Sequence, residues 1–87
     1  MANWRYTIDL HKVLGECEEQ YDLEEVEFPC PEPVKTAIVA ELDKAPPLRP
    51  FCADIKECKS IAAVNRVLDR VFNEADRKLV WCGMPGV

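Results

Sequence analysis

Carboxylate side chains give this sequence its clearest chemical signal, and half of them lie in one acidic stretch, residues 16–32. No Lys or Arg occurs between Lys12 and Lys35. Carboxylates spaced along one surface can imitate the phosphates of a nucleic-acid duplex and occupy a basic groove on another protein. The competing interpretation is a solvated loop, which is what most charge runs form. For partner binding, we expect the contact to be made by Glu18, Glu19, Asp22, Glu24 and Glu25.

Five cysteines are the next candidates for chemistry, and they are Cys17, Cys30, Cys52, Cys58 and Cys82. Their number is odd and no two form a Cys-x-x-Cys pair, so we interpret them as free thiols, some of them buried. Structural zinc sites favour ligand pairs separated by two to four residues, whereas Cys52 and Cys58 are six positions apart. Buried apolar thiols are the better interpretation, and we expect neither a metal nor a cofactor.

A thiol nucleophile would need a base, and His11 is the only histidine in the chain. Asp9 and His11 lie on one face of a predicted strand, so this pair beside Cys17 or Cys82 would complete such a site. A histidine near the end of a strand is usually an ordinary surface residue. The three glycines are too widely separated to form a phosphate-binding loop. We expect no catalytic residues and keep a thiol or metal-site protein as an alternative.

Composition and charge narrow the class of protein. Hydrophobic residues make up 48% of the chain and charged residues 31%, which is typical of a globular protein and not of a disordered one. The formal net charge of −5 argues against direct nucleic-acid binding, which needs clustered Lys and Arg. No apolar run approaches about 18 residues, and residues 1–10 lack a signal-peptide pattern. We expect a cytoplasmic protein that does not bind membranes.

Two patterns at the ends of the chain indicate the elements that position these residues. Residues 3–11 alternate apolar and polar, which predicts a strand whose buried side is Trp4, Tyr6, Ile8 and Leu10. Residues 60–78 repeat apolar side chains at steps of three and four, which predicts an amphipathic helix capped by Ser60. Its apolar stripe is Ile61, Val64, Val67, Leu68, Val71, Phe72 and Ala75. A short apolar run at 79–82 predicts a second strand.

The middle of the chain is rich in helix signals and prolines. Pro33 is suited to the first turn of a helix that we predict over residues 33–44. The proline-rich segment 45–50 predicts a stiff polyproline-like link. Asp54 followed by Glu57 predicts the capping box of a short third helix.

Two weaker signals lie closer to the N-terminus. Asp22 followed by Glu25 resembles a capping box and predicts one short helical turn. A helical turn that begins after His11 is expected to end at Gly15.

These elements predict a small α+β fold in one domain, residues 1–87, with residues 84–87 as a frayed tail. The N-terminal and C-terminal strands are expected in one sheet, packed under two to three helices in the order β-α-α-β. Two strands leave two open edges, so a homodimer that pairs through strand edges is a structural alternative.

The two ends of the chain resemble small bacteriophage and mobile-element proteins of unassigned activity. The residues that carry the resemblance are Trp4-Arg-Tyr-Thr-Ile-Asp-Leu10, Val67-Leu-Asp-Arg-Val-Phe-Asn-Glu-Ala-Asp76 and Leu79-Val-Trp81. Those proteins open with a Trp-x-Tyr-x-Ile-Asp strand and close with a Leu-Asp-x-Leu-Tyr-Asp-x-Ala-Asp helix before an apolar strand. Here Val71-Phe72-Asn73 replaces Leu-Tyr-Asp. The resemblance implies a mobile-element origin and assigns no site residue.

The leading functional hypothesis is a non-enzymatic, acidic interaction protein from a phage or related element. It binds a host or phage protein that has a basic surface. In its most specific form the hypothesis makes the chain an inhibitor of a nucleic-acid-handling defence system, in the manner of anti-CRISPR proteins.

Overall fold

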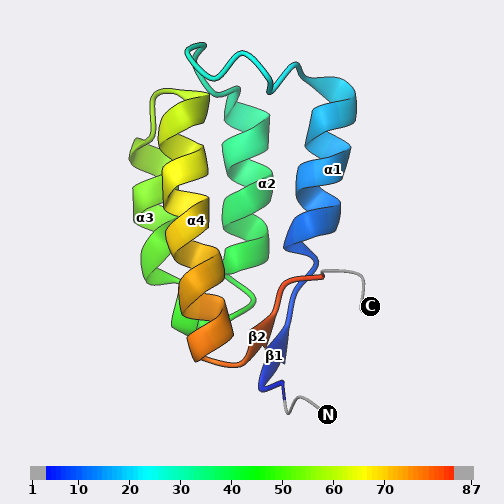
Figure 1. The fold of residues 1–87 in the computed structure, drawn as a ribbon, viewed down its shortest axis with the longest axis vertical. Helices are drawn as coiled ribbons and strands as arrows, with labels where there is room; N and C mark the ends of the chain where they lie inside the picture. Colours follow the sequence, from blue (N-terminus) through cyan, green and yellow to red (C-terminus); the bar gives the residue numbers. More distant parts are fainter. Residues whose placement is uncertain (1–3, 84–87) are drawn as a thin grey trace.

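Four helices and two short strands form the fold of residues 4–83, the part of the chain that this computed structural model describes (Figure 1). The elements are β1 (Tyr6–Thr7), α1 (Leu10–Gln20), α2 (Glu32–Leu42), the 3-10 helix η1 (Pro46–Leu48), α3 (Pro50–Glu57), α4 (Ile61–Arg77) and β2 (Val80–Trp81). Figure 1 shows the helices side by side with alternating directions and both strands at one end of the bundle. The predicted α+β class is confirmed, whereas the predicted tail lies outside the described residues.

The two strands pair in parallel, which confirms that the ends of the chain share one sheet. Tyr6 lies opposite Val80, and Thr7 lies opposite Trp81. Backbone hydrogen bonds extend the pairing: the Arg5 N–H donates to the Leu79 carbonyl at 2.7 Å, and the Ile8 N–H donates to the Trp81 carbonyl at 2.8 Å. Parallel strands need a long crossover, and here the entire helical bundle provides it.

The predicted N-terminal strand was too long, and its outer half is not buried. Ile8 and Leu10 belong to the core, but Trp4 and Tyr6 are exposed, with 41% of Trp4 accessible. The alternating pattern indicates which side chains share a face, but it does not indicate how far the helices extend over that face. Here they cover only the end of the pattern, and α1 begins at Leu10.

Helix α4 confirms the predicted amphipathic helix. The Ser60 side chain accepts a hydrogen bond from the Ala63 N–H at 3.2 Å, as expected of an N-cap. Phe72 is half-buried, and the rest of the predicted stripe is buried, namely Ile61, Val64, Val67, Leu68, Val71 and Ala75.

Helix α1 corrects the expectation that Gly15 ends a short turn. The helix continues through Gly15 to Gln20, which gives the chain one helix more than the two to three predicted. A Cβ atom at Gly15 would meet no neighbour within 4 Å, so glycine serves no packing need there. The apolar positions Leu10, Leu14 and Cys17 recur at helical spacing, and burying them outweighs the roughly 1 kcal/mol that glycine costs a helix.

The proline-rich middle also departs from the prediction. Helix α2 spans Glu32–Leu42, slightly offset from the predicted 33–44, and the expected polyproline-like link contains the 3-10 turn η1. Helix α3 begins at Pro50, where a proline costs no hydrogen bond. Asp54 therefore lies inside the helix and does not form the predicted capping box.

A buried carboxylate joins the end of α2 to the start of α1. Glu41 accepts the backbone N–H of Asp9 at 2.8 Å and the Lys44 ammonium at 3.0 Å. Burial opposes ionisation of Glu41, but the Asp9 N–H and Lys44 together outweigh it and lower the pKa of Glu41. We call these three residues the Glu41 junction.

Candidate functional site

The five carboxylates predicted to bind a partner come together at one end of the bundle. Glu18 and Glu19 lie in the last turn of α1, and Asp22, Glu24 and Glu25 lie in the loop that follows it. All five are exposed. In Figure 1 this loop crosses one end of the bundle, and the strands lie at the other end. The two ends are separated along the longest dimension of the molecule, which is about 39 Å. We call residues 16–28 at this place the acidic end.

The loop of the acidic end is held by the first turn of α4. The Ala62 N–H donates to the Val26 carbonyl at 2.9 Å, and the Ile61 N–H donates to the Phe28 carbonyl at 3.0 Å. The first N–H groups of a helix have no partner within the helix, so the loop supplies acceptors that the fold requires. An antiparallel bridge between Pro29 and Ser60 continues this contact. The acidic run is consequently a positioned segment and not a freely solvated one.

Short-range hydrogen bonds shape the loop itself. Asp22 accepts the Glu24 N–H on its side-chain oxygen at 3.1 Å, which closes a turn. The Phe28 N–H then donates to the Glu25 carbonyl at 3.0 Å. The structure has bends and turns here and no helix, so the predicted helical turn was wrong because the Asp22 side chain closes a local turn instead.

Two exposed apolar residues belong to the same segment as these carboxylates. Val26 is exposed, and Phe28 has 59% of its surface accessible, the largest value among the exposed large hydrophobic residues of the described chain. Their carbonyls cap α4, so the backbone that carries them is fixed. Exposed aromatic residues within a charged surface are typical of protein-binding sites. The sequence analysis singled out only the carboxylates of this stretch, because no sequence pattern indicates that Val26 and Phe28 are exposed.

Leu23 and Tyr21 do turn partly inward and are half-buried against the core. Together with Glu18, Asp22 and Glu24 they line a shallow pocket of about 320 Å³. The acidic end therefore offers both a negative rim and a recess that a side chain of another protein can enter.

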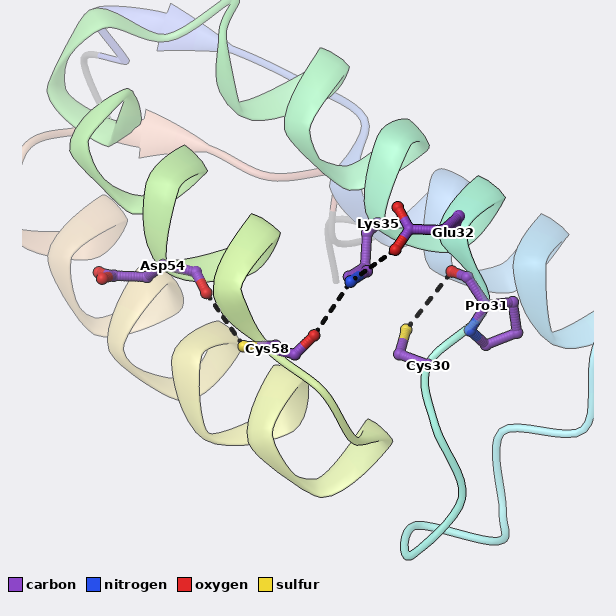
Figure 2. Close-up of polar contacts among 6 residues, drawn as sticks. All are labelled: Cys30, Pro31, Glu32, Lys35, Asp54 and Cys58. Carbon is purple, nitrogen blue, oxygen red and sulfur yellow. Dashed lines mark hydrogen bonds and ion pairs between the residues drawn. The ribbon is translucent and has the colours of Figure 1, made fainter.

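A buried lysine connects the helices beneath the acidic end (Figure 2). The Lys35 ammonium donates to the Cys58 carbonyl at 3.0 Å and forms an ion pair with Glu32 at 2.9 Å. The hydrogen bond to Cys58 joins the start of α2 to the end of α3, whereas the ion pair with Glu32 lies within α2. Because Lys35 is buried, its positive charge is paired inside the fold and is not exposed on the acidic surface.

The cysteines are suited to burial and poorly suited to nucleophilic chemistry. Burial raises the pKa of Cys17, Cys30, Cys52 and Cys58, and it raises the pKa of Cys82 to about 11. Figure 2 shows the Cys30 and Cys58 thiols directed toward the carbonyls of Pro31 and Asp54, at 3.7 and 3.1 Å. All five are free thiols.

The His11 ring stacks on Phe72, with ring centroids 4.9 Å apart, and the His11 backbone N–H donates to the Cys82 carbonyl at 3.0 Å. Among the side-chain hydrogen bonds of residues 4–83, none joins the His11 ring to a thiol. Within residues 4–83, no group of three or more His, Cys, Asp or Glu side chains is arranged to hold a metal ion. No helix in this same range has both the length and the apolar character needed to cross a membrane.

Comparisons of the chain with protein-family models, with curated proteins and with solved structures find no match.

Proposed function

We propose that this chain is a non-enzymatic binding protein whose acidic end docks on the basic surface of another protein. The observation that carries the proposal is that the exposed Phe28 ring and the exposed carboxylates share one segment, on a loop fixed to α4 by its own backbone. A solvated acidic loop would need neither the fixed backbone nor the exposed ring.

In this proposal, the charged and the apolar residues of the acidic end have different roles in binding. The carboxylates attract a basic surface and orient it, which speeds association and selects partners. Phe28 and Val26 supply the apolar area that resists dissociation. Because the loop is already ordered, binding does not bear the full entropy cost of ordering a flexible segment.

In its most specific form, the proposal makes the partner's basic surface a nucleic-acid-binding groove of a host defence protein. The chain would then act in the host cytoplasm as an inhibitor from a phage or related element, as anti-CRISPR proteins do. The acidic end supports this form because its charges stand at the surface with only Asp22 engaged in a side-chain hydrogen bond among the described residues.

The alternative of a homodimer formed by strand-edge pairing has less geometric support. Strands β1 and β2 are two residues long each, so their outer edges provide few backbone groups for a second chain. Edge pairing that stabilises a dimer normally uses longer strands.

A capture experiment with matched charge reversals tests the proposal. The acidic-end variant is Glu18→Lys/Glu24→Lys/Glu25→Lys, and the control variant is Glu57→Lys/Asp69→Lys/Asp76→Lys, at three exposed acids of α3 and α4. Each substitution adds two charges, so both variants move the formal net charge from −5 to +1. None of the six residues forms an ion pair within residues 4–83.

Proteins captured by the wild-type chain are identified, purified and titrated against all three chains by calorimetry. We expect the control variant to bind and the acidic-end variant to lose binding. Equal binding by all three chains, or equal loss in both variants, contradicts the proposal. Duplex DNA that competes with the wild-type chain for the captured protein identifies the partner surface as a nucleic-acid-binding groove.

A further inference from the structure

A second pocket lies at the opposite end of the bundle, where the strands, the end of α4 and η1 meet (Figure 1). It has a volume of about 600 Å³, and its walls include Arg5, Tyr6, Pro46, Arg77, Lys78 and Leu79. We call it the basic pocket.

Positive charge gathers in this pocket although the whole chain is acidic. Arg5, Arg77 and Lys78 are all exposed. Arg77 has a single ion-pair partner among the described residues, Glu74, at the long distance of 3.8 Å. Arg5 and Lys78 have none in that range. The positive charge of the pocket is thus largely available to an anionic ligand from outside.

Leu79 gives the pocket an apolar wall at a cost to the fold. It follows α4 with a φ of 58°, the left-handed conformation that a glycine usually adopts after a helix. Its side chain is nevertheless 38% exposed, beside the exposed Tyr6 ring. A strained residue that also exposes an apolar side chain is more consistent with a binding role than with a packing role.

We propose that the basic pocket binds the acidic end of a second copy of this chain. Glu24 and Glu25 match its cations, and the Phe28 ring matches the apolar surface of Tyr6 and Leu79. The two sites lie at opposite ends of the longest dimension, so one molecule cannot satisfy its own pocket. This contact is head to tail, and it leaves one free acidic end and one free pocket on every assembly unless a ring closes.

The inference rests on the proposed binding role of the acidic end and adds that the chain itself is one partner. Self-association then competes with a foreign partner for the same surface. A molecule within an assembly has its acidic end occupied, so dilution releases it for other proteins.

Sedimentation of the full chain tests this inference with two charge variants. The first is the acidic-end variant Glu18→Lys/Glu24→Lys/Glu25→Lys, and the second is the pocket variant Arg5→Glu/Lys78→Glu. Wild-type chain is expected to form assemblies that grow with concentration and dissociate at about 0.5 M salt, where surface charges are strongly screened. Each variant alone is expected to stay monomeric. An equimolar mixture is expected to associate again, because the unchanged acidic end of the pocket variant meets the unchanged pocket of the acidic-end variant and the two reversed surfaces also carry opposite charges.

Leu79→Gly provides a variant that does not depend on charge and does not threaten the fold. Glycine relieves the left-handed strain, so thermal stability should rise while self-association weakens about tenfold through loss of an apolar contact. A rise in stability with unchanged association overturns the role of Leu79 in the pocket.

Three results would overturn the inference as a whole: a monomeric wild-type chain at low salt, association that both charge variants retain, or a mixture that stays monomeric. The second result places the contact on a surface other than the acidic end and the basic pocket. If the pocket variant still captures a foreign protein while wild-type self-association is absent, the proposed function stands and only the head-to-tail contact fails.

Discussion

The acidic end and the Glu41 junction use the same chemical group for opposite purposes. Glu41 is buried and has two fixed partners, the Asp9 N–H and the Lys44 ammonium. At the acidic end, Glu18, Glu19, Glu24 and Glu25 are exposed and have no side-chain hydrogen bond or ion pair within residues 4–83. The carboxylate at the junction therefore connects two parts of the fold, whereas the acidic end is held mainly by backbone hydrogen bonds and leaves its charges exposed.

The strongest test of this contrast is Glu41→Ala. Removing the carboxylate leaves the Asp9 N–H, which makes a partly buried contact, without its partner, and an unsatisfied donor of this kind costs about 1–3 kcal/mol. We expect the free energy of unfolding, measured by urea denaturation, to fall by about 2–3 kcal/mol. A fall below about 0.5 kcal/mol, the usual range of surface substitutions, would place Glu41 in the same class as the acidic end.

Acidification tests the contribution of the Glu41 charge to the same junction. The lowered pKa of Glu41 means that its stabilising contribution is complete above the ordinary glutamate pKa of about 4.3. The contribution is lost as the pH falls through the lower pKa of the folded state. We expect the stability difference between wild-type chain and Glu41→Gln to be larger at neutral pH than in acid, by urea denaturation at both pH values. A difference that does not change with pH would show that the charge of Glu41 is not involved.

Ser60→Ala weakens the support beneath the acidic end. The substitution removes the acceptor of the Ala63 N–H at the start of α4 and typically costs about 1 kcal/mol. Because this is the helix turn that holds the loop, we also expect faster amide hydrogen exchange at Ile61 and Ala62. Faster exchange confined to the C-terminal half of α4 would show that the loop is held by other contacts.

The smallest effect on stability is expected from the acidic-end variant Glu18→Lys/Glu24→Lys/Glu25→Lys. These side chains make no contact that the fold needs, so the free energy of unfolding should change by no more than about 0.5 kcal/mol. Thermal unfolding beside the Glu57→Lys/Asp69→Lys/Asp76→Lys control provides the comparison. A large loss in the first variant alone would mean that these carboxylates serve the fold, and it would remove the contrast with Glu41.

The sequence was informative where one pattern repeated over many residues. Helix α4 has 17 residues with one apolar face, and its cap at Ser60 was predicted correctly. Helix α1 was not predicted at its full length, because an isolated glycine such as Gly15 weighs against a helix. Three apolar residues on the buried face of α1 nevertheless recur at helical spacing in the sequence. The first strand was predicted too long, because alternation does not indicate which part of a face the helices cover.

Functional geometry was less visible than the fold. The carboxylates of the acidic end were visible in the sequence as an acidic run. The exposure of Phe28 was not, because it depends on backbone carbonyls that cap α4, and a backbone carbonyl has no sequence signature. The basic pocket is assembled from three segments that are distant in the chain. Such a site appears only when the topology brings β1, η1 and the end of α4 together.

The parallel pairing of Tyr6 with Val80 has a consequence for biosynthesis. These residues are 74 positions apart, and contacts between distant residues form late in folding. When Ala62 has left the ribosome, the residues that fix the acidic end are outside it, whereas β2 has not yet emerged. The acidic end is therefore free to become ordered before the parallel pairing that completes the basic pocket.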